Sequence, residues 1–154
     1  MSFSRKAVLA LTGIAALAMP LAVAGSASAS TDARCTVTPL KPVFDHVNSS
    51  GEKVIKYETK VTCSAGRSIE ILDERRDHDN LSTDDFEGSN TYNLRFDSTT
   101  ETVTKYVLAV LPDADGWGDD NEEMYHSVRF RVTSNGVTSP WTAWEFSTVI
   151  SFHL

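Results

Sequence analysis

The sequence is short of positive charge and of cysteine. It has 154 residues, with 14 Lys and Arg against 21 Asp and Glu, a formal net charge of −7, and only two cysteines. Nucleic-acid binding depends on an excess of Lys and Arg for phosphate contacts, and a disulfide-dense miniprotein needs more than one cysteine pair. The hydrophobic share of 41% is too high for a disordered acidic tail. These shortages leave one ordinary globular domain that binds no nucleic acid.

The sequence also lacks the local motifs of common enzymes. It contains no GxSxG, no HExxH and no glycine-rich phosphate loop, and its histidines (His46, His78, His126 and His153) are isolated from one another. His126 falls at an inward strand position, where we expect a hydrogen-bonded core imidazole rather than a base. His46 and His78 fall in acidic loops, which leaves a small secreted hydrolase as the least favoured alternative. We therefore predict a protein that is not an enzyme.

The first 29 residues have the organisation of a signal peptide. Arg5 and Lys6 form a basic start, residues 7–23 are almost wholly apolar, and an Ala-Ser-Ala sequence ends at Ala29. The apolar core is shorter than the ~20 residues that a membrane span needs. We expect cleavage after Ala29 and release of residues 30–154 as one secreted, extracellular, monomeric domain without membrane attachment. Loss of the two basic residues leaves 12 Lys and Arg against 21 Asp and Glu, a net charge of −9.

Cysteine use agrees with export. Cys35 and Cys63 are the only pair, and an oxidising compartment favours a disulfide between them. Closing this loop would stabilise the fold by about 3 to 4 kcal/mol on the chain-entropy model. Two reduced, buried thiols are the alternative. A metal site at the cysteines is not expected, because the pair has no CxxC or HxxxH companion.

Apolar residues after the leader recur with a period of two, as they do in half-buried strands. Ile55, Tyr57, Thr59, Val61 and Cys63, for example, alternate with charged or polar neighbours. Clusters of Gly, Asn, Asp and Ser separate seven such runs. We therefore predict an all-β protein, a seven-stranded antiparallel β-sandwich. The expected strands cover residues 34–40, 55–63, 67–75, 90–97, 101–111, 122–133 and 141–152.

Alternating strand directions predict that the acidic residues gather at one end of the sandwich. The connections at 41–52, 77–90 and 112–122 would lie at the same end. Together they hold 12 of the 21 carboxylates. Both cysteines would lie at the opposite end. The sequence therefore predicts an acidic pole and a disulfide pole.

Two of these acidic loops contain candidate calcium ligands. Residues 113–120 alternate Asp and Gly, a composition that bends a backbone around a cation with hard oxygen ligands. Counted from the first Asp, however, EF-hand spacing puts Trp117 and Met124 where ligands belong. The alternative is a pair of solvated turns whose charge keeps the domain soluble. The candidate ligands are Asp77, Asp79, Asp113, Asp115, Asp119 and Asp120.

The last hairpin is the most informative stretch of the sequence. Arg129 and Arg131 share one face of a strand by their period of two. Trp141 and Trp144 share a face only if the returning segment is polyproline-like, for which Pro140 is a suitable start. The interleaved side chains would form a cation–π ladder with roughly 0.5 to 1 kcal/mol for each exposed contact. The alternative is that the tryptophans cap the two faces of an edge strand.

This hairpin resembles the last two strands of fibronectin type III domains, and Trp141-Thr142-Ala143-Trp144-Glu145 resembles the WSXWS box of cytokine-receptor modules. The resemblance implies an immunoglobulin-like or fibronectin type III-like sandwich in which tryptophans stack between arginines. Thr142 can supply the hydroxyl of the first serine, whereas Glu145 replaces the second with a carboxylate that cannot donate. Cytokine binding is not implied, because the box stabilises the domain in that family.

The sequence as a whole favours a secreted, non-enzymatic binding or interaction module for an extracellular protein or carbohydrate. The alternative is a calcium-binding β-sandwich whose acidic loops, residues 77–90 and 112–122, order around the ion. On the first hypothesis a chelator leaves the melting temperature unchanged, whereas on the second EDTA lowers it. No other cofactor is expected.

Overall fold

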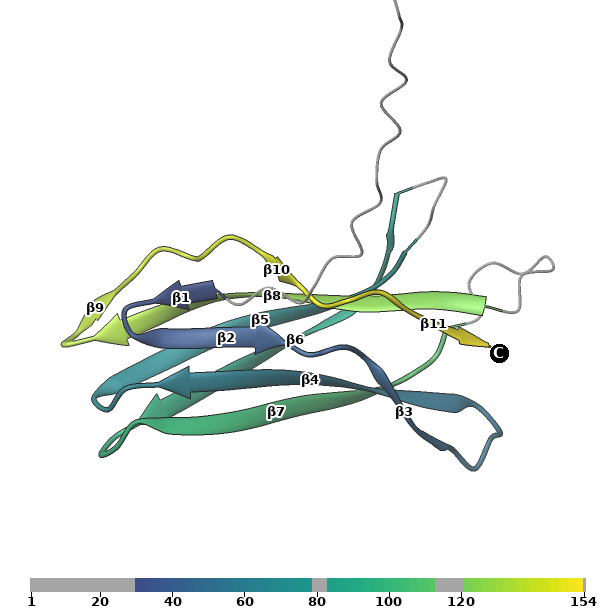
Figure 1. Ribbon diagram of the computed structural model, residues 1–154, viewed down its shortest axis with the longest axis horizontal. Helices are drawn as coiled ribbons and strands as arrows, with labels where there is room; N and C mark the ends of the chain where they lie inside the picture. Colours follow the sequence, from purple (N-terminus) through teal and green to yellow (C-terminus); the bar gives the residue numbers. More distant parts are fainter. Residues whose placement is uncertain (1–29, 79–82, 113–120, 154) are drawn as a thin grey trace, which may run out of the picture.

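The computed structural model describes residues 30–78, 83–112 and 121–153, and within these ranges the chain forms strands and no helix (Figure 1). A search of the same ranges accordingly finds no helical segment that could cross a membrane. The all-β prediction is confirmed. The strands are β1 (Ser30–Asp32), β2 (Cys35–Pro39), β3 (Val43–Val47), β4 (Lys53–Cys63), β5 (Arg67–Asp77), β6 (Asp85–Phe96), β7 (Glu101–Val110), β8 (Asn121–Ser134), β9 (Val137–Thr138), β10 (Glu145–Phe146) and β11 (Ile150–His153).

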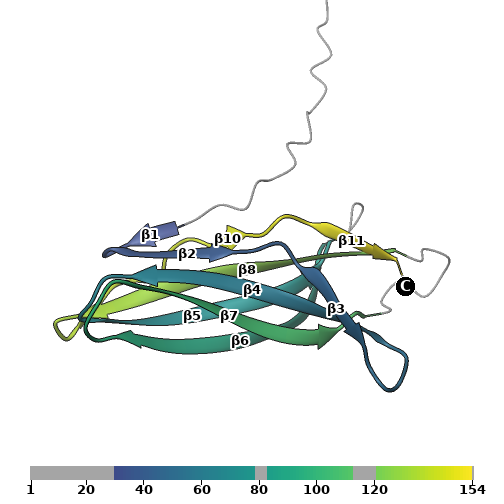
Figure 2. The same ribbon diagram turned by 60° about the horizontal axis from the view of Figure 1, so that its bottom comes forward.

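The strands form two antiparallel sheets that pack as layers (Figure 2). In the first sheet β4 is central: β7 pairs along one side of it, and β2 and β3 pair in succession along the other, with β1 outside β2. In the second sheet β5 lies between β6 and β8. The short strands β9, β10 and β11 follow the other edge of β8.

Alternate side chains of the long strands fill the space between the sheets. On β8 every second residue from Met124 to Val132 is buried, which is the inward set that the period of two predicts. On β4 the residues from Ile55 to Cys63 repeat the pattern. His126 belongs to the inward set of β8, and Asp73 takes an inward place on β5. The interior is therefore apolar along only part of its length.

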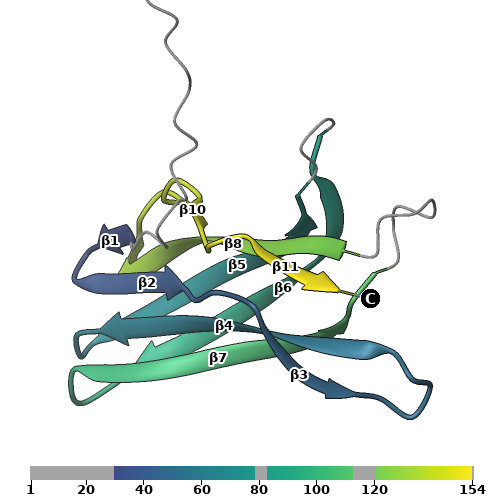
Figure 3. The ribbon, with the colours of Figure 1, turned by 45° about the vertical axis from the view of Figure 1, so that its right-hand side comes forward.

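The strand register separates the two poles. Cys35 pairs with Cys63 at one end of the first sheet, and Asp77 pairs with Asp85 at the other end of the second. Figure 3 shows the β3–β4 hairpin at the end opposite the turns that join β4 to β5 and β6 to β7. The predicted placement of the connections is confirmed for the described residues. The disulfide pole comprises the turns at 64–66, 97–100 and 135–136; the acidic pole comprises Asp45, Glu52, Asp77, Asp84, Asp85, Glu87 and Glu122.

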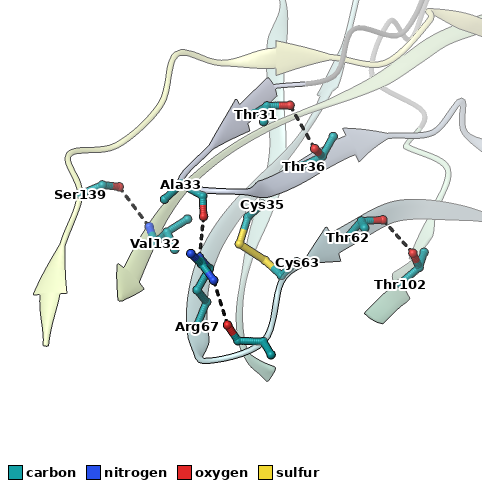
Figure 4. Close-up of a disulfide and its surroundings, with 11 residues drawn as sticks. Thr31, Ala33, Cys35, Thr36, Thr62, Cys63, Arg67, Thr102, Val132 and Ser139 are labelled. Carbon is teal, nitrogen blue, oxygen red and sulfur yellow. Dashed lines mark hydrogen bonds between the residues drawn. A yellow bond between two sulfur atoms is a disulfide. The ribbon is translucent and has the colours of Figure 1, made fainter. Parts of the chain in front are cut away.

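The disulfide joins Cys35 and Cys63, as the sequence predicts, with a Cα–Cα distance of 4.1 Å (Figure 4). Both residues are fully buried, on adjacent strands of the first sheet. In antibody domains, by contrast, the disulfide links the two sheets. Arg67 closes this end, because its Nε donates to Ala33 O over 2.6 Å and its Nη1 to Ala65 O over 2.8 Å.

Three of the strand predictions are corrected. Residues 41–52 were expected to form a loop but contain β3, which is largely exposed and so shows no alternation of buried positions. The strand expected at 90–97 begins at Asp85, five residues earlier, and includes a bulge opposite Arg75 and Arg76. The single strand expected at 141–152 is wrong, since only β10 and β11 are regular there.

Candidate functional site

The outer face of the second sheet contains the expected arginine and tryptophan ladder. Arg129 Cζ lies 5.1 Å from the ring centre of Trp141 and 4.6 Å from that of Trp144. Arg131 Cζ lies 4.9 Å from the Trp141 ring, and its Nε donates to Glu70 Oε2 over 2.6 Å. Both tryptophans therefore stack on the same arginine. The alternative in which they cap opposite faces of an edge strand is wrong.

Three hydroxyl groups hold the segment after β9 against β8. Ser139, Thr142 and Ser147 accept hydrogen bonds from backbone N–H groups of β8 at 3.1, 3.1 and 3.0 Å, the first of which is drawn in Figure 4. Their own backbone N–H groups donate to carbonyl oxygens of the same β8 residues at 2.8, 2.9 and 2.9 Å. Pro140 and its neighbours do not form a regular strand beside β8. The three hydroxyl oxygens therefore accept from N–H groups of β8 that would otherwise bond to the carbonyl oxygens of a neighbouring strand.

A small hollow with aromatic walls lies beyond the ladder, at the acidic pole. Tyr125 OH donates to Asp84 Oδ2 over 2.5 Å, and His78 Nδ1 lies 3.0 Å from Asp84 Oδ1. The Tyr125 ring stands 6.3 Å from His78 and 6.2 Å from Phe146 between centres. The hollow encloses about 280 Å³. We call it the aromatic hollow; its walls are His78, Asp84, Tyr125, Phe146, Ser147 and Val149.

The environment of Tyr125 fixes its protonation. Burial raises the pKa of Tyr125 above its ordinary value, and the hydrogen bond to Asp84 raises it further. The phenol therefore keeps its proton at neutral pH and donates it to the carboxylate. Asp84 accepts from both neighbours only in its ionised form, if His78 presents Nδ1–H. The Asp84 carboxylate therefore lies beside the Tyr125 and His78 rings and is hydrogen-bonded to both.

Ser147 lines the same hollow, so the hollow contains the residue types of a hydrolytic triad. The Ser147 hydroxyl makes hydrogen bonds to other groups, however. Ser147 Oγ accepts from the backbone N–H of His126 and donates to Thr148 O over 3.3 Å. A serine nucleophile needs its proton directed to a base. The hydrogen bonds of Ser147 therefore do not direct its proton to His78.

A row of side chains crosses this face from Phe86 on β6 through Arg76 on β5 to Tyr125 on β8, and Phe146 on β10 lies diagonally beside Tyr125, opposite Ser127. The strand register places Arg76 opposite both Phe86 and Tyr125. Arg76 Cζ lies 5.8 Å from the Phe86 ring, and its Nη2 donates to Glu74 Oε2 over 2.8 Å. This hydrogen bond raises the pKa of Arg76. A second hollow, of about 230 Å³, shares Tyr125 and Phe146 with the first and continues toward the ladder.

The interior beneath the row contains a buried histidine and aspartate pair. His126 Nδ1 lies 2.9 Å from Asp73 Oδ1, and His126 Nε2 lies 2.7 Å from Leu40 O. Thr59 Oγ1 donates to the other Asp73 oxygen over 3.0 Å. A carbonyl oxygen only accepts, so Nε2 has a proton, and a second proton lies between Nδ1 and Asp73. The pair is therefore neutral overall and, as expected for His126, structural rather than solvent-accessible.

Arg75 enters the same interior from β5. Its Cζ lies 5.9 Å from the Tyr57 ring, and the ring of Tyr57 stands 5.6 Å from that of His126. Burial raises the pKa of Tyr57 well above its ordinary value, and the Arg75 charge opposes that shift. Gly88 adopts φ of 134°, and a Cβ there would lie 2.4 Å from Arg75 Nη2. A side chain at this position would displace the end of Arg75, and few residues other than glycine adopt this φ.

The calcium hypothesis is tested only in part by the structure. Asp77 is 3% exposed on β5, and Glu122 is 1% exposed on the neighbouring strand β8. Asp79, Asp113, Asp115, Asp119 and Asp120 lie outside the described residues. Within the described part of the chain, no group of three or more acidic, histidine or cysteine side chains could hold a metal ion. His46 pairs with Asp45 at 2.7 Å on the exposed β3.

Sequence reasoning missed the aromatic hollow and the buried pair, although both leave a signal. Tyr125 occupies an outward position of a strand that ends beside the acidic loop containing His78 and Asp84. Asp73 and His126 occupy inward positions on strands that become neighbours only after folding. A polar residue at an inward position indicates a buried hydrogen-bonding partner. The sequence pattern does not identify which residue that partner is.

Comparisons with protein-family models, with curated proteins and with solved structures find no match to this chain.

Proposed function

We propose that this chain is a secreted, non-enzymatic module that binds an extracellular protein or carbohydrate through the outer face of the second sheet. The binding face comprises Arg76, Asp84, Phe86, Tyr125, Trp144 and Phe146. The observation that carries the proposal is the exposure of Phe86 and Phe146, 56% and 50%, on either side of Arg76 and Tyr125. Grouped exposed aromatic side chains beside shallow hollows are typical of interaction sites.

The secreted location is proposed on the leader and the disulfide. The leader has a basic start, an apolar core and a small-residue end, and the Cys35–Cys63 bond suits an oxidising compartment. The strand order and the ladder support an immunoglobulin-like or fibronectin type III-like sandwich with a WSXWS-like box. The observations in its favour are the Arg129 and Arg131 contacts and the Thr142 hydroxyl, which accepts from Phe130 N.

The experiment is a selection followed by matched substitutions. Residues 30–154 are panned against a random peptide library and a glycan panel, and the ligands found are measured on variants. Phe146→Ala and Phe86→Ala are expected to weaken binding by about tenfold, as central aromatic contacts do. Val137→Ala, which removes a 73% exposed side chain at the disulfide pole, is the control and should change nothing. Ligands that bind both phenylalanine variants normally would contradict the proposal.

Calcium binding is a second candidate function, proposed on the alternating Asp and Gly of residues 113–120 and on the acidic residues of 77–90, whose oxygen ligands suit this cation. If calcium binds, EDTA lowers the melting temperature, and Asp77→Asn, Asp113→Ala and Asp115→Ala abolish the difference. An unchanged melting temperature with and without EDTA would exclude this function. The hydrolase alternative predicts turnover of peptides, glycans or esters, and we expect none.

A further inference from the structure

We propose that the outer face of the second sheet binds a linear, neutral oligosaccharide along β5 and β8. The inference rests on the proposed function, chooses carbohydrate as the ligand class and extends the binding face toward the disulfide pole. Its basis is a series of three hollows on this face. The first is the hollow of about 230 Å³ described above, which we call the aromatic-side hollow. The middle hollow encloses about 250 Å³ and the end hollow, at the disulfide pole, about 200 Å³.

The three hollows follow one another along β5. Glu74 and Arg76 line the aromatic-side hollow, and Glu70 lines the middle hollow. Ser68 lines both the middle and the end hollow, as does Thr133, its partner on β8. The eight residue steps from Arg76 to Ser68 cover about 26 Å of strand. A ligand that fills all three hollows must therefore be extended and several units long.

Each hollow contains one carboxylate paired with one guanidinium. The pairs are Glu74 with Arg76 at 2.8 Å, Glu70 with Arg131 at 2.6 Å, and Asp97 with Arg95 at 2.5 Å. The two charges balance within each hollow. A carboxylate has lone pairs for further donors, and a guanidinium has five N–H donors. Each hollow therefore offers acceptors and donors side by side, which suits a hydroxyl group because a hydroxyl both donates and accepts.

The aromatic-side hollow adds a surface for the face of a sugar ring. Trp144 and Tyr125 line it beside the Glu74 and Arg76 pair. Trp144 is held in place by Arg129, whose Cζ lies 4.6 Å from its ring centre. A sugar ring has hydroxyl groups at its edge and C–H groups on its faces, and polarised C–H groups pack against the negative face of an aromatic ring. A fixed ring and a fixed ion pair reduce the entropy cost of binding.

Other extended ligands fit this face less well. An anionic chain would meet a carboxylate in every hollow and a secreted chain with a net charge of −9. An extended peptide binds most readily as an added strand at a free sheet edge. β5 has no free edge, because it is paired along its length with β6 on one side and β8 on the other. A neutral chain of hydroxyl groups avoids both difficulties.

The test measures binding of linear hexasaccharides to the secreted chain, residues 30–154, by titration of amide chemical shifts. The neutral probes are cellohexaose, xylohexaose, mannohexaose and maltohexaose, and hexagalacturonate is the acidic probe. We expect at least one neutral probe to bind, with shift changes centred on β5 and β8. The matching disaccharide, which fills one hollow, and hexagalacturonate should each bind at least about tenfold more weakly, the effect of losing one hydrogen bond to a charged group.

Matched substitutions separate the hollows from the overall charge. Glu70→Gln and Glu74→Gln should each weaken the neutral probe by about tenfold. Glu58→Gln is the control, because it removes the same charge from an ion pair with Lys56 at 3.3 Å on the first sheet, and it should leave the affinity unchanged. Asn93→Ala, at an exposed position of β6 in the middle hollow, should weaken the probe about threefold. This variant retains the fold if the glutamate variants do not.

The outcomes distinguish the two proposals. No binding of any neutral probe, equal affinity of disaccharide and hexasaccharide, or equal losses in Glu70→Gln and Glu58→Gln would overturn the oligosaccharide site. If selected peptides depend on Phe86 and Phe146 while no hexasaccharide binds, the binding face is supported and the carbohydrate ligand is wrong. If no peptide or glycan depends on any residue of the face, both proposals fail.

Discussion

The two halves of the sandwich interior are built from the same strands but from different chemistry. Near the disulfide pole the inward residues of β5 and β8 are Ile69, Ile71, Phe130 and Val132, packed around the cysteines. Nearer the acidic pole the next inward residues are Thr59, Tyr57, Asp73, Arg75 and His126. The first half is stabilised by apolar burial, which tolerates many sequences. The second adds buried polar groups, which depend on specific partners, to a smaller apolar cluster of Ile55, Tyr57, Leu111 and Met124.

This difference places the binding face over the polar half. Tyr125 of the aromatic hollow and His126 of the buried pair are consecutive on β8 and point to opposite sides of the sheet. The hydrogen bonds of His126 to Asp73 and Leu40 restrain the backbone on which Tyr125 stands. We infer that the polar interior supports the shape of the hollow above it.

The largest expected effect comes from breaking the buried pair. Asp73→Ala removes the partner of both His126 and Thr59 and should cost about 3–5 kcal/mol of unfolding free energy, as loss of one member of a buried ion pair does. Replacing both members, Asp73→Leu with His126→Leu, should cost less than the single change, because no buried imidazole is left without its carboxylate and only the hydrogen bonds of Thr59 and of Leu40 O are lost. Urea denaturation measures both. A double variant less stable than the single one would refute the comparison.

Loss of the disulfide should come next. Cys35→Ala with Cys63→Ala should lower the unfolding free energy by about 3–4 kcal/mol, the estimate for a loop of this length. The apolar half should still pack, because its remaining residues are unchanged. Denaturation of the double variant and of reduced wild-type protein should give the same midpoint. Different midpoints would show that the substitutions act through packing instead.

Alkaline pH should weaken the polar half further. Burial raises the pKa of Tyr57 above its ordinary value of 10.0. Above pH 10 the unfolded chain therefore releases this proton while the folded chain keeps it, so stability falls as pH rises, by at most about 1.4 kcal/mol for each pH unit. Tyr57→Phe should flatten the decline, measured by urea denaturation between pH 9 and 11. Tyr106→Phe, on the exposed outer face, is the control.

Tyr92 should make a smaller contribution in the same direction. Burial raises its pKa to about 12. The ultraviolet absorbance change that reports its deprotonation should therefore occur at a clearly higher pH in the folded protein than in the unfolded protein. A Tyr92→Phe variant that leaves the folded titration curve unchanged would contradict the assignment.

The smallest expected effect is at the ladder, outside the interior. A double-mutant cycle with Arg129→Met and Trp144→Leu should give a coupling energy of about 0.5–1 kcal/mol, the range for an exposed cation–π contact. Thermal or urea denaturation of the four proteins measures it. A coupling near zero would mean that the stacking seen at 4.6 Å adds nothing to stability.

The sequence predicts the long strands because burial of one strand face requires apolar residues at every second position, and this alternation is visible in the local sequence. It predicts the Arg129 and Trp144 contact from two different periods, two for the arginines of β8 and three for tryptophans in a polyproline-like segment. It does not predict β3, whose side chains are mostly exposed. Nor does it predict that Asp73 meets His126, because partner choice depends on which strands become neighbours and in what register.

The Cys35–Cys63 bond has a mechanical consequence. It lies within one sheet and closes a segment 28 residues long, so a force applied at the two ends of the domain passes through the sulfur atoms and bypasses β2, β3 and β4. Those strands add no extension until the bond is reduced, and reduction then releases roughly 90 Å of chain. A domain of this kind under tension would lengthen in two stages, the second controlled by the redox state of its surroundings.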